Sequence, residues 1–157
     1  MNVILIHVGQ LKEKYFADAV AEYEKRLGGF CRLTNVLIKD TPAENEAQIE
    51  LALQNEGEKI LQAMSKHPKC LFAALCIEGK SYSTYDLLSL IDKATLRGQD
   101  IGFIIGGSHG LSEKVKAACA ERMSMSSMTF PHRLARVMLL EQIYRCSSII
   151  KGSKYHK

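Results

Sequence analysis

Short apolar stretches alternate with longer amphipathic stretches along the whole of this chain. The strand patterns cover residues 2–8, 33–38, 70–77, 101–105 and 123–126. The helical patterns cover residues 13–27, 44–65, 83–96, 112–120 and 133–150. Strands that alternate with helices predict an α/β domain whose sheet is mostly parallel and flanked by helices. A chain of 157 residues is expected to form one such domain, over residues 1–157.

A glycine-rich turn follows the strand pattern that ends at Ile105. It covers residues 106–110, with the sequence Gly-Gly-Ser-His-Gly, and a helical pattern begins at Ser112. Glycine lets the backbone approach a ligand closely, and open α/β sheets bind ligands at the carboxyl ends of their strands. The turn therefore indicates either a ligand-binding loop or a simple connection. It matches neither the dinucleotide-binding pattern nor the P-loop pattern.

Two further loops follow strand patterns. One covers residues 75–80 at the end of a nearly all-apolar stretch, which is typical of a strand buried on both faces of a parallel sheet. The other covers residues 125–132, where Pro131 fixes φ close to the start of the last helix. Because the carboxyl ends of parallel strands share one edge of the sheet, the three loops are expected to form a pocket there.

Positive charge is concentrated at the C-terminal end of the chain. The net charge is +4, yet residues 132–157 hold six basic residues and one acidic residue, which is a net charge of +5. This concentration is typical of a protein that binds a polyanion, and it also occurs on solvated helices with basic ends. The helical pattern in this region is apolar on more than one side, which indicates either a buried helix or a dimer interface.

The composition argues against several classes of protein. No apolar run approaches the roughly 18 residues of a membrane span, and the first residues lack the basic segment of a signal peptide. The five cysteines are widely spaced without a Cys-x-x-Cys pair, and the spacing of a metal site is absent. We expect a cytoplasmic protein with reduced thiols, no metal and no membrane partner.

A set of short motifs, in order over essentially the whole chain, resembles the SPOUT-class methyltransferases. The motifs are Val8-Gly9, Glu22-Tyr23-x-x-Arg26, Glu56-Gly57, Leu75-x-Ile77-x-Gly79-Lys80, Ile105-Gly106-Gly107-x-x-Gly110-Leu111, Ser126-x-Met128-Thr129-Phe130-Pro131-His132, Arg136-Val137, Glu141-Gln142-x-Tyr144-Arg145 and Tyr155-His156-Lys157. Within that class, the resemblance is to the ribosomal RNA large subunit methyltransferase H family, which methylates N3 of a pseudouridine in 23S ribosomal RNA.

The resemblance implies a fold, a cofactor and an assembly. The expected fold is an α/β domain with a C-terminal trefoil knot, and the expected cofactor is S-adenosyl-L-methionine. The residues expected to bind this cofactor are Leu75, Gly106, Met125, Ser126, Ser127, Met128, Thr129 and Phe130. The resemblance also implies a homodimer, in which the cofactor pocket of one subunit meets the C-terminal tail of the other. The substrate is expected to be 23S ribosomal RNA, in the context of the ribosome.

The reaction requires loss of the N3 proton from a uracil-type base, which predicts a base and a cationic environment near the acceptor. We nominate His156 as the proton acceptor or substrate anchor and Tyr155 as the residue that positions the base. Arg133, Arg136 or Arg145 would offset developing charge and hold phosphates, and Glu141 could instead orient an arginine.

Two other functions remain open at this point. The first is a SPOUT methyltransferase that acts on another RNA, such as tRNA. The second is a dimer that binds RNA or nucleotides without catalysis.

Overall fold

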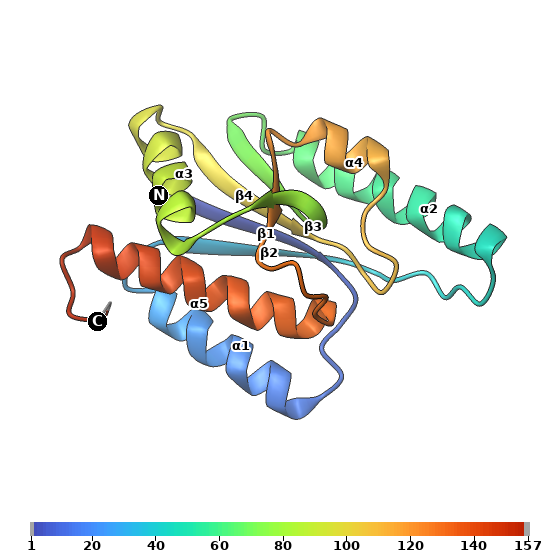
Figure 1. The fold of residues 1–157 in the computed structure, drawn as a ribbon, viewed down its shortest axis with the longest axis horizontal. Helices are drawn as coiled ribbons and strands as arrows, with labels where there is room; N and C mark the ends of the chain where they lie inside the picture. The colour runs from blue at the N-terminus through green and yellow to red at the C-terminus, as the bar shows by residue number, and fades with distance from the viewer. Residues whose placement is uncertain (1, 156–157) are drawn as a thin grey trace.

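The structure, a computed structural model, describes residues 2–155 and consists of a five-stranded sheet with helices on both faces (Figure 1). The elements, in chain order, are β1 (Asn2–Val8), α1 (Lys14–Leu27), β2 (Arg32–Ile38), α2 (Glu46–Ser65), β3 (Cys70–Ser81), α3 (Thr84–Leu96), β4 (Asp100–Ile105), α4 (Glu113–Ala118), β5 (Glu121–Ser124) and α5 (His132–Ile150). The strand order is β2-β1-β4-β3-β5, and every neighbouring pair is parallel. The predicted α/β fold is confirmed, whereas the predicted knot stays a prediction.

The sheet separates two apolar cores because side chains alternate between its faces. On β1, Val3 and Leu5 belong to the core that packs against α1, α3 and α5. Ile4 and Ile6 belong to the opposite core, which packs against α2 and α4. Figure 1 shows the same layers, with α1 and α5 below the sheet and α2 and α4 above it.

β3 is longer than its sequence pattern predicts. Its first half is buried, as the apolar run indicates, but the strand continues to Ser81. Leu75 and Lys80 both pair with Met123 of β5, so residues 76–79 form a bulge between two paired segments. A Cβ at Gly79 would lie 2.7 Å from the carbonyl oxygen of Arg122, and only glycine fits this close contact. The expected strand end at residues 75–80 is therefore a bulge within β3.

Helix α5 is covered along most of its length. Every residue from 132 to 149 is buried or half-buried, and the helix contacts both α1 and α3.

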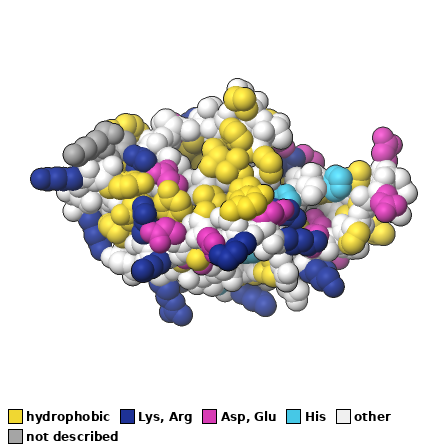
Figure 2. All heavy atoms as spheres, turned by 90° about the horizontal axis from the view of Figure 1, so that it is seen from below, with side chains coloured by type: hydrophobic (Ala, Val, Ile, Leu, Met, Phe, Trp, Pro, Cys, Tyr) yellow, Lys and Arg dark blue, Asp and Glu magenta, His cyan; other side chains and the backbone are white. Residues whose placement is uncertain are grey.

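Figure 2 shows the side of the molecule that α1 and α5 form in Figure 1. Hydrophobic side chains gather in the middle of this face, with histidine and basic side chains next to them. The dimer-interface interpretation of this helix stays a prediction.

A buried polar cluster joins α5 to the strands. Arg136 is only 8% exposed, and its guanidinium lies 3.4 Å from Nδ1 of His7 and 3.4 Å from a carboxylate oxygen of Glu24. It also donates a 3.5 Å hydrogen bond to Asn35. The expectation that Arg136 holds RNA phosphates is wrong, because its charge is buried and used inside the fold.

This cluster predicts acid sensitivity of the fold. Burial, helped by the charge of Arg136, lowers the pKa of His7 to about 4 from 6.5. Between these pH values the unfolded chain binds a proton at His7 that the folded chain excludes. The free energy of unfolding is therefore unaffected by His7 above pH 6.5 and falls, by up to about 3 kcal/mol, as the pH drops to 4.

Urea unfolding at a series of pH values, on the wild type and on His7→Asn, measures this dependence. We expect the difference in unfolding free energy between the two proteins to change with pH across this range. Parallel pH profiles of the two proteins would contradict the prediction.

Candidate active site

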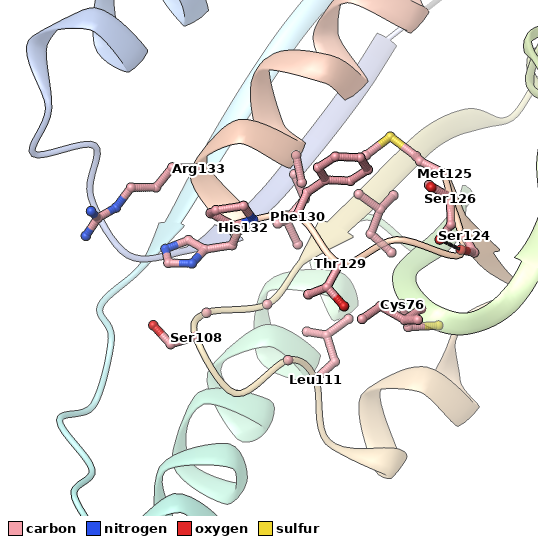
Figure 3. A pocket seen from close by; sticks show the side chains of 18 of the residues that line it. Cys76, Ser108, Leu111, Ser124, Met125, Ser126, Thr129, Phe130, His132 and Arg133 are labelled. Carbon is pink, nitrogen blue, oxygen red and sulfur yellow. Dashed lines mark hydrogen bonds between the residues drawn. The ribbon is translucent and has the colours of Figure 1, made fainter.

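A cavity of about 1100 Å³ opens at the carboxyl ends of β3, β4 and β5 (Figure 3). Its walls come from the bulge of β3, the glycine turn after β4 and the segment between β5 and α5. The N-terminal end of α1 and the first residues of α5 complete the wall. The three loops that the sequence indicates therefore converge on one cavity.

Most of the residues expected to bind the cofactor line this cavity. They are Leu75, Gly106, Met125, Ser126, Met128, Thr129 and Phe130, whereas Ser127 is not among the lining residues. Figure 3 shows the side chain of Met125 pointing toward the ring of Phe130, with Thr129 beside the open space. The segment is held by its own serines, since Ser124 Oγ donates to the carbonyl of Ser126 at 2.8 Å and Ser126 Oγ accepts from the amide of Met128 at 3.0 Å.

The glycine turn closes tightly on itself. A Cβ at Gly106 would lie 2.3 Å from the carbonyl oxygen of Gly110, so only glycine fits at this position. Gly110 has a φ of +78°, and its amide donates to the carbonyl of Gly107 at 3.1 Å. The three glycines of the turn line the cavity together with Ser108 and His109, and at the glycines a ligand is able to approach the main chain closely.

The Glu56-Gly57 motif of α2 lies next to the glycine turn, and the sequence alone does not indicate its role. Glu56 is buried, and its carboxylate accepts a 2.8 Å hydrogen bond from the amide of Thr41. Burial is the main reason that its pKa is raised. A Cβ at the next residue, Gly57, would lie 2.7 Å from Oγ of Ser112, which is the N-cap of α4. The Glu56-Gly57 motif thus holds α2 close to the element that follows the glycine turn.

Three ion pairs involve residues that line the cavity. Lys116 contacts Glu78 of the β3 bulge and Glu113, the latter at 2.5 Å, and its side chain is 10% exposed. The hydrogen bond from Lys116 lowers the pKa of Glu78. Arg133 forms an ion pair with Glu13, which immediately precedes α1. Sequence reasoning missed Lys116, Glu78 and Glu13 as site residues, because their partners are distant in the chain.

His132 also lines the cavity, at the first position of α5. Burial, followed by the charge of Arg133, lowers its pKa below 6.5, so the imidazole is neutral at pH 7. A neutral imidazole is able to accept a proton. In Figure 3, His132 and Arg133 lie on the opposite side of the cavity from Cys76. His109, in the exposed part of the turn, lines the cavity as well.

Two of the expected catalytic residues, Arg145 and Tyr155, do not line this cavity. Tyr155 donates a 3.3 Å hydrogen bond to Glu141, and its ring lies 4.9 Å from the guanidinium of Arg145. Arg145 in turn donates to Glu141 at 2.6 Å, so Glu141 does orient an arginine. Arg145 follows His132 by 13 positions of α5, or about 20 Å along the helix axis. His156 lies outside the described residues.

A second cavity, of about 560 Å³, lies between α3 and α5. Its lining includes Thr84 at the start of α3 and Glu141 and Gln142 of α5. The hydroxyl of Thr84 donates to the amide oxygen of Gln142 at 2.7 Å, which fixes the two helices together. Met123 and Met125 line both cavities and thus form part of the wall between them.

Within residues 2–155, no group of three or more His, Cys, Asp or Glu side chains is arranged to hold a metal ion. Among the helices of the same residues, none is long and apolar enough to cross a membrane.

Comparisons with known proteins identify relatives over the whole chain. A family described as predicted SPOUT methyltransferase matches residues 1–156. Ribosomal RNA large subunit methyltransferase H of Streptococcus thermophilus is 47% identical, and the alignment covers 100% of both chains. The proteins of that name from Clostridium acetobutylicum and Bacillus pumilus are 43% and 40% identical, again over 100% of both chains.

Solved structures share the fold at low sequence identity. A probable methyltransferase from Bordetella pertussis has a TM-score of 0.58 at 13% identity, covering 92% of this chain and 95% of that one. A probable rRNA-methyltransferase from Porphyromonas gingivalis has a TM-score of 0.55 at 14% identity, covering 95% of this chain and 69% of that one.

Proposed function

The chain belongs to the SPOUT methyltransferases and, within them, to the ribosomal RNA large subunit methyltransferase H family, and from this membership we propose its reaction. It transfers a methyl group from S-adenosyl-L-methionine to N3 of a pseudouridine in 23S ribosomal RNA. The observation that carries the proposal is the convergence of three loops, one of them a glycine turn without room for a side chain at Gly106, on one cavity of about 1100 Å³.

The lining of the cavity suits this methyl donor. Leu75, Met125 and Phe130 offer apolar surface for an adenine ring, while the hydroxyl of Thr129 and the backbone of the glycine turn offer polar groups. Sites of this kind combine apolar walls with a few placed polar groups. The residues that would hold the donor are therefore Leu75, Gly106 and the segment 125–130. When bound, it supplies an electrophilic methyl group on a sulfonium.

The protein then has to align the acceptor nitrogen and help to remove its proton. His132 lines the cavity as a neutral imidazole and is one candidate for the proton acceptor. His156, next to Tyr155 in the sequence, is the other. Arg133 lies at the same cavity, where its charge favours an acceptor that has lost a proton.

The proposed active form is a homodimer in which the tail of one subunit completes the cavity of the other. Arg145 of α5 and Tyr155, which follows the end of α5, lie together, and Arg145 is about 20 Å along the helix axis from His132 at the cavity of its own chain. A symmetric pair of subunits is the simplest assembly that brings such distant parts together. The hydrophobic side chains on the α1 and α5 side provide a surface for this pairing (Figure 2).

Mass mapping of ribosomal RNA tests the proposed function. Ribosomes from a bacterial strain that lacks the corresponding gene are incubated with the purified protein and S-adenosyl-L-methionine. We expect one additional methyl group on a pseudouridine of the large-subunit RNA, and none when the donor is omitted or when Gly106→Ala replaces the wild type. Methyl transfer to tRNA instead, or binding of RNA without any transfer, would contradict the proposal.

A further inference from the structure

The cavity is larger than a single small ligand requires. Sites for such ligands are usually roughly 300–1000 Å³, whereas this cavity measures about 1100 Å³. Three residues at the N-terminal end of α1, Glu13, Tyr15 and Phe16, add to its wall and lie outside the loops expected to bind the methyl donor. This part of the cavity is thus available to a second molecule.

Tyr15 is the most exposed aromatic residue at this end of the cavity. It is 67% exposed although it lines the cavity, so it stands at the rim and not in the interior. Its ring lies 4.6 Å from that of Phe16, at an interplanar angle of 55°. Phe16 is half-buried and packs against the ring of Tyr15 at this angle. The ring of Tyr15 is therefore the aromatic surface that this end of the cavity presents to solvent.

The rim is also held in place by an ion pair, and it carries basic side chains. The ion pair between Glu13 and Arg133 ties the start of α1 to the start of α5, which holds Tyr15 next to the cavity. Lys12 and Lys14 precede Tyr15 in the sequence and both are exposed, with Lys14 in an ion pair with Asp18 at 2.5 Å. Basic groups around an exposed aromatic ring are the usual means by which proteins bind single-stranded nucleic acid.

We infer that Tyr15, supported by Phe16, stacks on an RNA base that flanks the methylated nucleotide. The inference rests on the proposed function and adds to it a contact with the substrate. The methylated base has to enter the cavity to reach the donor, as a base must leave its stack to be modified. Because Tyr15 stands at the rim, it contacts a neighbouring nucleotide that stays outside. Tyr15 is thus a substrate-positioning residue.

Two substitutions at Tyr15 distinguish the contribution of the aromatic ring to RNA binding from that of apolar surface and from that of the hydroxyl. Loss of a base–aromatic stack is expected to raise KM for ribosomes about tenfold in Tyr15→Leu. Tyr15→Phe keeps the ring and is expected to stay within about twofold of the wild type. In both variants kcat, the Kd for S-adenosyl-L-methionine from calorimetry and the melting temperature should match the wild type. Leu51→Ala, an exposed apolar position on α2, serves as the control.

The outcomes distinguish this inference from the proposed function. An unchanged KM in Tyr15→Leu, with wild-type transfer to 23S ribosomal RNA, would overturn the stacking role alone. An equal defect in Tyr15→Phe would assign the effect to the hydroxyl and also overturn it. A shift in dimer dissociation measured by sedimentation, without a change in KM, would show instead that a second subunit covers Tyr15. If the wild type transfers no methyl group to ribosomal RNA, both the proposed function and this inference fail.

Discussion

Gly106→Ala is expected to weaken binding of the methyl donor by about a hundredfold, equivalent to about 2.7 kcal/mol. The added Cβ would lie 2.3 Å from the carbonyl oxygen and 2.4 Å from the carbonyl carbon of Gly110. Both atoms are backbone, so the turn has to open before even a methyl group fits. The expected damage is thus to the shape of the turn, and not only to the space that a ligand would fill. Calorimetric titration with S-adenosyl-L-methionine measures the effect.

Gly102→Ala is the matched control, because it creates a clash in β4, the strand that precedes the turn, and away from the cavity. A Cβ at Gly102 would lie 2.3 Å from the ring of Phe72, inside the core of the sheet. This variant should lose thermal stability while its folded fraction keeps the wild-type affinity for the donor. Wild-type affinity in Gly106→Ala would remove the glycine turn from the site.

Removal of residues 153–157 is expected to reduce methyl transfer to RNA by about a thousandfold, since it deletes the groups expected to position the base and accept its proton. The donor affinity should stay the same because the cavity is formed by other segments. The fold should survive as well, since the described part of this tail contacts α5 through the amide of Ser153, which donates to the carbonyl of Ser148 at 2.8 Å, and through the side chain of Tyr155. Transfer assays, calorimetry and thermal unfolding on the same preparation check the three expectations. A truncated chain that methylates ribosomes normally would exclude a catalytic tail.

Mixing two inactive variants tests whether the tail acts across subunits. Gly106→Ala provides an intact tail, and the truncated chain provides an intact cavity. After exchange of subunits, half of the dimers are mixed and each holds one complete site, so about a quarter of the wild-type activity should return. If each chain instead uses its own tail, the mixture stays inactive.

Local patterns in the sequence predict most of the fold. Ser83 forms the expected cap of α3, with its hydroxyl accepting from the amide of Asp86 at 3.1 Å. The apolar stretch at residues 2–8 forms the expected strand, β1, whose side chains enter both cores. The sequence does not predict the extension of β3, because residues 78–81 lack a strand pattern and the strand resumes only through pairing with β5. Such pairing depends on a partner some 40 residues away in the chain, which propensity does not register.

The candidate site, like the fold, could be predicted from the sequence only in part. The loops that bear the expected cofactor residues could be predicted, because strand ends and glycines are visible in the sequence. The charged residues could not, since an arginine in a basic helix looks the same whether it binds RNA or is buried. Arg136 is buried because Glu24 and Asn35, from α1 and β2, meet it in the fold. Arg133 meets Glu13 across 120 positions of the chain.

The two methionines shared by the cavities have a thermodynamic consequence. Met123 and Met125 contribute to the lining of both the cavity at the strand ends and the cavity between α3 and α5. Methionine side chains are unbranched and readily change shape, so a molecule that displaces them in one cavity alters the volume of the other. Occupancy of the two cavities is therefore coupled, and the coupling free energy is the same whichever cavity is filled first.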